Sequence, residues 1–494
     1  MKTLFTNAKF YSMDKRDDYF DACLVEDGYV KETFKGNIPN FQGNIVDLKG
    51  ACVLPGFIDS HTHSFEGGLY SKGVDCSNIK DLAELFELLS QAKPMSNMVF
   101  AWNFDENSIT EKRFPTIEEL DRVIPHMPLL LRRSDGHSCI INTKALHSIK
   151  WKYPLPEPFT GLLRGDLNDN AAHWFHKNLS DESILDAYHA AEEIAFKTGH
   201  TTVFTMIGDA QDDVLHFDLI FKHRLDFRID YELYPQILNI DKAQKCNEFL
   251  VGGCILADGS FGSHTAALCQ PYADMPDNYG TAYQSQAFWD KFLLTANNRT
   301  LQTAVHCIGD FAIKQLITAI ERAQAVGESF LQHQIIHCEL VDDEMIERMA
   351  KAGISAVMQP AFDRYWGGEN GFYAKVLGKE RALSTNRLKS LVDAGVLVTG
   401  SSDWCVTPID ALLGIDSALN MHNPKERLDI YEAVSLYTRN PCKLIFVEPS
   451  FGFLVRNSNA DFVCLDKDIF ETGNVKDTHI TAVYKKGTKV YGDS

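Results

Sequence analysis

The strongest constraint on the fold is an alternation of helix and strand patterns that begins at about residue 183. The segment 183–199 carries apolar residues at helical spacing and ends at Gly199, and the next segment, TTVFTMIG, is typical of a short buried strand. The alternation continues to about residue 404. It predicts parallel pairing, because a crossover helix returns the chain to the start of the next strand.

Eight segments of the chain have the pattern of a buried strand. They are VLPGFIDSHTH, TTVFTMIG, FRIDYELYP, CILADG, TLQTAVHCIGD, HQIIHCEL, ISAVMQP and VLVTGSSDW. Eight such strands favour a (β/α)8 TIM barrel, an α/β fold, over an open sheet. The first segment ends near residue 64 and the second starts at residue 201, so we expect an insertion within about 66–182.

Residues 1–53 and 446–494 differ in character from the central block, 54–445. Both are built from short strand patterns separated by turns, such as CLVEDGYV near the start and HITAVYKKGTKVYGD near the end. We therefore expect the two termini to form one small sheet domain, separate from the barrel.

The composition disfavours several classes of function. The 67 acidic residues against 48 Lys and Arg give a formal charge of -19, which repels phosphate backbones and anionic membranes. The sequence has no signal-peptide pattern at its start and no apolar run of about 18 residues. The 12 cysteines are scattered and include no CxxC pair, so we expect them to be reduced thiols. We expect a cytoplasmic protein that binds a small molecule and neither nucleic acid nor membrane; a homo-oligomer is compatible with the sequence.

Residues that bind metals fall at the carboxyl ends of the predicted strands, where a (β/α)8 barrel has its active face. The first strand ends in His61 and His63, the fifth in His306, the sixth in His337 and the eighth in Asp403. Residues two apart in a strand point to the same side, so the first pair can hold one ion. Imidazole nitrogens and carboxylate oxygens are ligands of zinc and similar divalent ions.

A single histidine at the end of a strand is more often a buried polar residue with a hydrogen-bond partner than a metal ligand. His306 or His337 alone would therefore predict little. The prediction of a metal site depends on the whole set, because five residues of suitable types fall at the ends of four strands of one predicted barrel.

Seven segments, in order over nearly the whole chain, resemble the amidohydrolase superfamily: VLPGFIDSHTH, DGHSCIINTKAL, GCILADGSFGSHTAAL, AVHCIGD, IIHCELV, VMQP and TGSSDWCVTPID. The similarity is closest to its YtcJ-like branch, amidohydrolase family 3, which includes N-substituted formamide deformylases. The resemblance implies a distorted (β/α)8 barrel with a β-sandwich domain formed from both termini. It also implies metal-dependent hydrolysis, usually of an amide-type C–N bond, with one or two divalent ions such as zinc.

The resemblance also implies the ligand set. The family's histidines correspond to His61, His63, His306 and His337, and its eighth-strand acid corresponds to Asp403. Many members carry a carbamylated lysine on the fourth strand, which bridges two metals, and this chain has Cys254 there. A thiolate can ligate or bridge zinc, and D-aminoacylases of the superfamily use a cysteine ligand. Alternatively, Cys254 is an inert buried thiol and the site holds one metal.

Asp403 is the expected proton shuttle of the implied reaction. It would accept a proton from the attacking water and deliver it to the leaving nitrogen, because an amine anion is too basic to depart unprotonated. His137, in the segment RRSDGHS, matches a histidine of the branch that faces the site, where it could stabilise an oxyanion. It could equally be a solvated loop residue.

We expect substrate contacts from the inserted segment and from loops that follow the strands. The candidates are Asp135, His137, His264, Phe362 and Trp404. The aromatic residues favour a substrate with an apolar moiety, although each of them could instead pack one loop against another.

The sequence therefore predicts a metal-dependent amidohydrolase that cleaves an amide-type C–N bond of a small N-acyl or N-formyl compound. A deaminase or cyclic-amide hydrolase on the same scaffold is an alternative, which the released product would distinguish. A catalytically degenerate binding protein is another. The cysteine at position 254 would suit that alternative, and the retained four histidines and one aspartate disfavour it.

Overall fold

The fold is described from a computed structural model that covers residues 2–38, 40–134, 136, 138–327 and 330–492. The chain divides into two compact units. One comprises Met1–His63 together with Glu193–Ser494, and the other comprises Ser64–Glu192. Each unit is stabilised by buried apolar clusters of its own.

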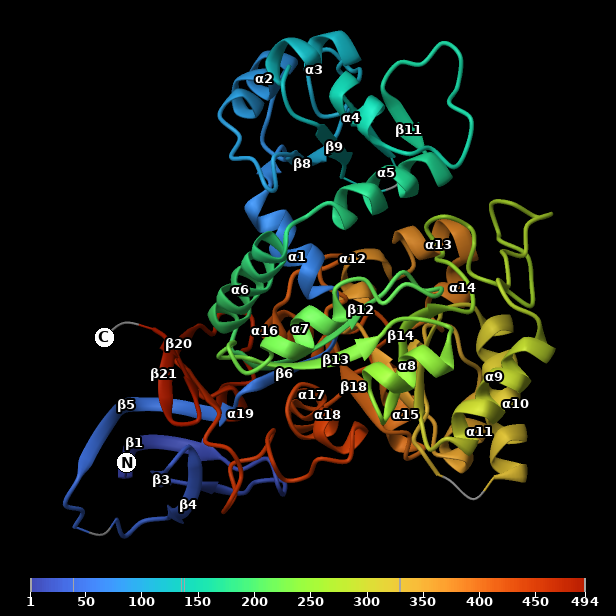
Figure 1. The fold of residues 1–494 in the computed structure, drawn as a ribbon. Helices are drawn as coiled ribbons and strands as arrows, with labels where there is room; N and C mark the ends of the chain where they lie inside the picture. Colours follow the sequence, from blue (N-terminus) through green and yellow to red (C-terminus); the bar gives the residue numbers. More distant parts are fainter. Residues whose placement is uncertain (1, 39, 135, 137, 328–329, 493–494) are drawn as a thin grey trace. The chain divides into compact units, whose positions relative to one another are not determined.

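Both ends of the chain contribute to one eight-stranded sheet (Figure 1, blue and red). Its strands are β1 (Lys2–Tyr11), β2 (Tyr19–Phe20), β3 (Ala22–Glu26), β4 (Tyr29–Phe34), β5 (Asn44–Pro55), β19 (Phe462–Leu465), β20 (Ile480–Lys485) and β21 (Thr488–Tyr491). Their order is β21-β20-β19-β5-β1-β3-β4, with β2 paired to β1. Strand β5 is parallel to β1 and antiparallel to β19, so it joins the N-terminal strands to the C-terminal ones.

The core of this terminal sheet is aromatic and draws on both ends of the chain. The ring of Phe5 lies 5.0 Å from that of Phe462 and 5.2 Å from that of Tyr484, in edge-to-face geometry. Such pairs add to the stabilisation that comes from burying the rings. The packing explains why two segments more than 400 residues apart in the sequence form one structure.

The central block contains parallel strands at all eight segments where the sequence predicts them. Three form one sheet: β6 (Phe57–Thr62), β12 (His200–Ile207) and β13 (Asp230–Pro235). Five form a second sheet: β14 (Leu250–Leu256), β15 (Gln302–Cys307), β16 (Gln334–His337), β17 (Ser355–Met358) and β18 (Val398–Gly400). One core cluster takes side chains from both sheets, among them Phe204, Tyr234, Leu250 and Ile336. This arrangement is a TIM-barrel type of α/β fold.

Backbone hydrogen bonds join the first of these strands to the segment after the last. The N–H of Asp403 donates to the carbonyl of His61 at 3.0 Å, and the N–H of His63 donates to the carbonyl of Trp404 at 2.6 Å. The ends of β6 and of the β18 segment therefore lie side by side.

Helices occupy the connections between the parallel strands and the segment after β18. They are α7 (Phe217–His223), α8 (Ile240–Cys246), α9 (Gln286–Asn298), α10 (Asp310–Val326), α11 (Asp343–Ala352), α12 (Pro360–Trp366), α13 (Phe372–Leu377), α14 (Lys379–Ala382), α15 (Leu388–Asp393), α16 (Ala411–Leu419), the 3-10 helix η1 (Pro424–Glu426), α17 (Ile430–Leu436), α18 (Arg439–Leu444) and α19 (Ile469–Thr472). Helix α11 shows how the sequence sets their ends: the Asp342 side chain caps its start, and Gly353 ends it in a left-handed conformation. In the described ranges, no helix has the length and apolarity to cross a bilayer.

The unit Ser64–Glu192 has a five-stranded sheet in the order β11-β10-β9-β8-β7. Its strands are β7 (Val74–Asp75), β8 (Val99–Phe104), β9 (Leu129–Arg133), β10 (Ser138–Ile141) and β11 (Leu162–Arg164). Its helices are α1 (Ser64–Lys72), α2 (Leu82–Ser90), α3 (Ile117–Val123), α4 (Thr143–Ser148), α5 (Asp166–Lys177) and most of α6 (Asp181–Lys197). Leu85, Leu120 and Leu131 belong to its core, so the sheet and the helices α2 and α3 pack together.

Candidate metal centre

The end of β6 brings two histidines together. The strand is buried along its whole length, and His61 is fully buried, while 22% of the His63 side chain is exposed. Their ring centroids lie 5.4 Å apart with the planes nearly perpendicular. The spacing of two residues therefore gives the shared orientation that the sequence predicts.

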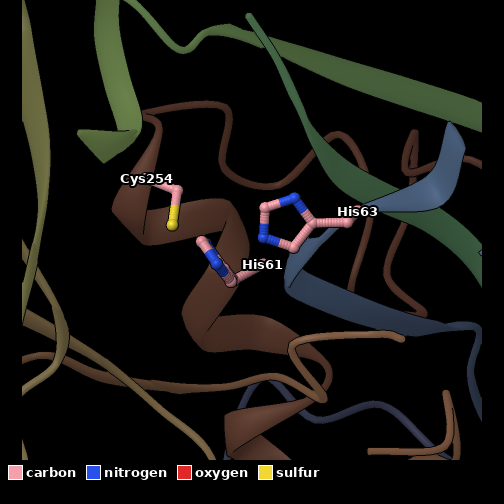
Figure 2. Close-up of side chains that lie close together, drawn as sticks. All are labelled: His61, His63 and Cys254. Atoms are coloured by element: carbon pink, nitrogen blue, oxygen red, sulfur yellow. The ribbon is translucent and has the colours of Figure 1, made fainter. Parts of the chain in front are cut away.

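Cys254 lies opposite this pair because of a bulge in β14. The register with β15 shifts between Gly252 and Ile255, and Gly252 and Gly253 have φ of 99° and 105°. A Cβ at Gly253 would lie 2.1 Å from the sulfur of Met206, so only glycine fits there. The donor atoms of His61, His63 and Cys254 all lie within 4.8 Å of one another (Figure 2).

His306 and His337 lie beside this group, on β15 and β16. The ring of His337 is 5.6 Å from that of His61 and 4.5 Å from that of His306, measured between centroids. Both histidines belong to the neighbourhood of the site, although they fall outside the tightest group of donor atoms.

The Asp403 carboxylate faces the same group. Its Oδ1 lies 3.3 Å from Nε2 of His61 and 3.5 Å from Nε2 of His63. Asp403 is itself buried, and its backbone bond to His61 fixes its position. The five residues that the sequence singles out at the strand ends, and Cys254, are thus near one another.

The donors fit a divalent ion such as zinc. Within the part of the chain that the structure describes, Nδ1 of the buried His61 and Nδ1 of His306 have no hydrogen-bond partner, and Nε2 of His61 has the Asp403 carboxylate nearby but makes no well-aligned hydrogen bond. Buried polar atoms seldom remain unsatisfied, so a ligand for these nitrogens is expected. Two imidazoles, a thiolate and a carboxylate are ligands that zinc accepts, and donors around one tetrahedral ion lie roughly 3.5 Å apart.

The groups at this centre influence one another's ionisation. Burial raises the pKa of the Cys254 thiol, but the imidazoles of His337, His61 and His63 outweigh this effect, and the pKa lies well below its usual value. Burial also acts against the charged forms of His61 and Asp403. Their mutual attraction prevails, so the pKa of His61 rises to about 9 and that of Asp403 falls below its usual range.

The pKa values of His63 and His337 shift in opposite directions. The pKa of His63 is raised well above its usual value despite burial, because Asp403 and Cys254 lie close to it. Burial and the neighbouring His306 lower the pKa of His337. Asp403 and Cys254 therefore favour the protonated forms of His61 and His63, so binding of a metal ion would release protons.

Three buried residues that sequence reasoning missed hold the centre in place. The Asp59 carboxylate accepts hydrogen bonds from the backbone N–H groups of His61 and Ser402. Oε1 of Gln359 lies 2.8 Å from Nδ1 of His337, and its Nε2 donates to Ser401. Asp59 could have been identified from the sequence, because it lies two residues before His61 and shares its side of the strand.

Asp258 is the third of these residues. Its carboxylate accepts hydrogen bonds from the backbone N–H groups of Ala267, Ile308 and Gly309. Its Oδ1 lies 3.7 Å from Nδ1 of His306, and this proximity raises the pKa of His306 against the effect of burial. One carboxylate thus connects the loop after β14 to the end of β15.

The predicted substrate residues have varied surroundings. Phe362 stacks on the ring of His337 at 5.9 Å, and Trp404 is buried beside the end of β6. His264 instead pairs with Asp274, with Nε2 3.0 Å from the carboxylate, and lies against the ring of Tyr272. The predictions for Asp135 and His137 fall outside the described residues.

Known proteins resemble the chain over nearly its whole length. Residues 44–491 match the model of the amidohydrolase family. YtcJ of Bacillus subtilis (strain 168) is 27% identical over 95% of this chain and 95% of its own. N-substituted formamide deformylase of Arthrobacter pascens is 24% identical over 99% of this chain and 98% of its own.

A solved structure supports the same relationship. The crystal structure of an uncharacterized metal-dependent hydrolase from Pyrococcus furiosus superposes with a TM-score of 0.81 and 25% identity. The superposition covers 95% of this chain and 100% of the other. The similarity therefore extends to the fold of nearly the whole chain.

Proposed function

Because this chain belongs to the amidohydrolase family and is an enzyme that acts on C–N bonds, we propose that it hydrolyses an amide-type bond of a small N-acyl or N-formyl compound in the cytoplasm, with zinc as its metal. The observation that carries the proposal is the group of donor atoms of His61, His63 and Cys254 within 4.8 Å of one another. The buried His61 imidazole, neither nitrogen of which makes a well-aligned hydrogen bond to a described residue, supports a metal there.

We assign the metal ligands to His61, His63 and Cys254, with His306, His337 and Asp403 completing a site for one or two ions. Cys254 takes the position of the bridging lysine of other members, and its low pKa supports a thiolate donor. If Cys254 ligates metal, its thiolate could hold two ions together; if it does not, the site would hold a single ion.

A divalent ion bound here lowers the pKa of water and polarises a carbonyl oxygen. The protein's own contribution is proton transfer and orientation. Asp403 is ionised at neutral pH, since its pKa lies below its usual range, so it can accept the proton of the attacking water. The carboxyl group that results can then protonate the nitrogen that leaves. We assign His137 and Asp135 to substrate binding on sequence similarity alone.

We further propose that the two parallel sheets close into a distorted (β/α)8 barrel. The backbone hydrogen bonds between the end of β6 and the segment after β18 support closure at that seam. Residues 1–53 and 446–494 would form the β-sandwich domain, and 54–445 the barrel with an insertion within about 66–182. The central position of β5 in the terminal sheet supports this division.

The substrate class follows from the relatives and from the aromatic residues near the site. One relative bears the name N-substituted formamide deformylase. Phe362 on His337, with Trp366 4.8 Å from Phe362, forms an aromatic surface beside the proposed ligands. An N-acyl or N-formyl amine with an apolar substituent fits such a surface.

Metal content and product analysis test this function together. Elemental analysis should find zinc in the protein and a loss of most of it in the His61→Ala, His63→Ala double variant, because two ligands are gone. His479→Ala is a matched control, since 77% of that side chain is exposed. A screen of N-formyl and N-acyl amines should release an amine together with a carboxylate.

Two outcomes would contradict the proposal. Equal metal content in the wild type and the double variant would remove the assigned site. Release of ammonia in place of an amine would identify a deaminase on the same scaffold.

A further inference from the structure

A pocket lies at the amino ends of the strands, opposite the ends that carry the candidate metal centre. Its volume is about 410 Å3. Glu232 of β13 and the first residues of β14 and β15, Leu250 and Gln302, contribute to its wall. Its other lining residues are Asn247, Phe249, Thr300, Leu331, Ile445, Phe446 and Val447. The volume is in the range of sites for small molecules.

The wall of this pocket is mainly apolar. Leu250 is buried, and Leu331, Ile445 and Val447 are partly buried. Phe249 and Phe446 form part of the rim and remain 70% and 58% exposed. A ligand with a hydrocarbon body would cover these aromatic side chains and gain the free energy of apolar burial.

The two amide side chains in the wall already have hydrogen-bond partners. Asn247 donates to the carbonyl of Leu233 and accepts from the N–H groups of Phe249 and Leu250. Gln302 donates to the carbonyls of Leu331, Gln332 and Leu444 and accepts from Gln334. These groups therefore shape the pocket and offer little to a ligand.

Glu232 is the charged residue among the lining residues that the structure describes. Among the described residues it makes no side-chain hydrogen bond and no ion pair. The nearby cation Lys485 is held by Asp230 and Asp461 instead, at 2.5 and 2.7 Å. Burial and the neighbouring Asp230 raise the pKa of Glu232 to about 7 against the opposing effect of Lys485, as expected for a carboxylate that lacks a partner.

We propose that this pocket binds a small organic ammonium ion with an apolar body, its nitrogen on the Glu232 carboxylate and its hydrocarbon part against Phe249, Ile445 and Phe446. An anion would be repelled by Glu232. A neutral hydrocarbon would bury the carboxylate further without a partner, which is costly. An ammonium ion satisfies both the charge and the apolar wall. The site is separate from the metal centre and does not depend on the function proposed above.

Calorimetric titration of the full-length protein tests the site with benzylamine as the ammonium probe and benzyl alcohol as its neutral analogue. Glu232→Gln keeps the shape of the side chain and removes its charge. Glu248→Gln is the matched control, because Glu248 is exposed, lies outside the pocket lining and carries the same charge. Soaking crystals with 4-bromobenzylamine and recording anomalous diffraction locates the bound probe.

We expect the wild type and Glu248→Gln to bind benzylamine equally. Glu232→Gln should bind it roughly tenfold to a hundredfold more weakly. The wild type should bind benzyl alcohol more weakly than benzylamine by a similar factor. The bromine peak should lie in the pocket. Phe446→Ala provides a second test if Glu232→Gln does not fold, since Phe446 is exposed; it should weaken binding severalfold.

Other results would overturn the proposal. They are equal affinity of the wild type and Glu232→Gln, a bromine peak only at the metal centre, and no binding below roughly 10 mM. Sedimentation that reveals a dimer which Phe446→Ala dissociates would also overturn it, because a second copy of the chain would then cover the pocket.

Discussion

His337 and Asp403 show what the candidate metal centre requires of single residues. Their φ angles are 70° and 54°, a left-handed conformation that residues other than glycine seldom adopt. Such a conformation costs on the order of 1 kcal/mol or more and persists where the surroundings fix it. Gln359 holds the His337 ring, and the His61 carbonyl holds the Asp403 backbone. The strain favours a functional role for both residues.

Asp403→Asn should impair turnover far more than folding. The amide keeps the shape of the side chain and removes its ability to accept a proton, so kcat should fall about a hundredfold or more. The melting temperature should change little. Steady-state kinetics on a substrate from the screen and a thermal melt measure both effects; full activity of the variant would exclude the proton-transfer role.

Cys254→Ser should lower metal occupancy, because a neutral hydroxyl replaces a thiolate donor. His61 and His63 should retain part of the affinity. Cys269→Ser is the control, since Cys269 is an exposed cysteine elsewhere in the chain. Elemental analysis after dialysis against zinc distinguishes the two. If Cys254→Ser and the control hold equal metal, Cys254 is a packing residue and the site has one ion.

The sequence predicts the residue types of the centre but not the partners that orient them. His61 and His63 are recognisable from their spacing at a strand end. The bond between Asp59 and the N–H of Ser402 joins residues 343 positions apart, and no local pattern specifies such a pair. The pairing of His264 with Asp274 depends on the conformation of the loop between them, which the sequence does not reveal either.

A buried lysine of strand β20 in the terminal sheet forms an ion pair with strand β13. Lys485 is 5% exposed and contacts Asp461, which is 1% exposed, and Asp230 of β13. The attraction of these carboxylates raises the pKa of Lys485 against the effect of burial. The lysine therefore remains charged and joins the two sheets at neutral pH.

Lys485→Met should destabilise the protein strongly, because it leaves the Asp461 carboxylate buried without its cation. The expected loss is about 3–5 kcal/mol in the free energy of unfolding. Lys2→Met is the matched control, because Lys2 pairs with Glu26 at the surface and 56% of its side chain is exposed. Its free energy of unfolding should fall by about 0–1 kcal/mol. Urea denaturation compares them, and equal stability of the two variants would contradict the role given to Lys485.

The bulge in β14 explains why the sequence misplaced the start of this strand. The pattern CILADG suggested a strand that begins at Cys254, whereas β14 begins at Leu250. Two consecutive glycines ordinarily indicate a turn. Here both adopt positive φ inside the strand. A Cβ at Gly252 would meet the carbonyl oxygen of Ala304, and one at Gly253 would meet the sulfur of Met206, so neither position has room for a side chain.

At the scale of the whole molecule, buried neutral histidines should make stability depend on pH. Burial lowers the pKa of His333 to about 4 and that of His200 to about 3. The unfolded chain binds a proton at each histidine near pH 6.5, and the folded protein does so only at lower pH. The free energy of unfolding should therefore fall as pH decreases from 6.5 towards 4.

His333→Asn should reduce this dependence on pH. Between pH 7 and pH 4.5 the wild type should lose roughly 2–3 kcal/mol more than the variant, since its buried imidazole resists protonation. Asparagine can still accept the hydrogen bond that Nδ1 of His333 receives from the N–H of Thr303. His479→Asn, on an exposed side chain, should behave as the wild type does. Identical pH profiles for both variants would refute the assignment.

Periodicity predicts much of the fold because the features concerned are local. Each of the eight parallel strands is a short apolar segment followed by a helical pattern or a loop, and each overlaps the segment where it is expected. The interior of the unit Ser64–Glu192 could not be predicted in this way. Its sheet joins parallel and antiparallel pairs of strands as short as two or three residues, and tertiary packing determines such pairings.

The position of β5 at the centre of the terminal sheet affects how the chain must be made. A ribosome releases β5 about 400 residues before its neighbour β19, a delay of roughly 20–80 s at about 5–20 residues per second. Throughout that delay one edge of β5 has no strand to pair with, and such an edge readily joins another chain. Successful synthesis in the cell therefore depends on keeping nascent copies apart until the last strands emerge.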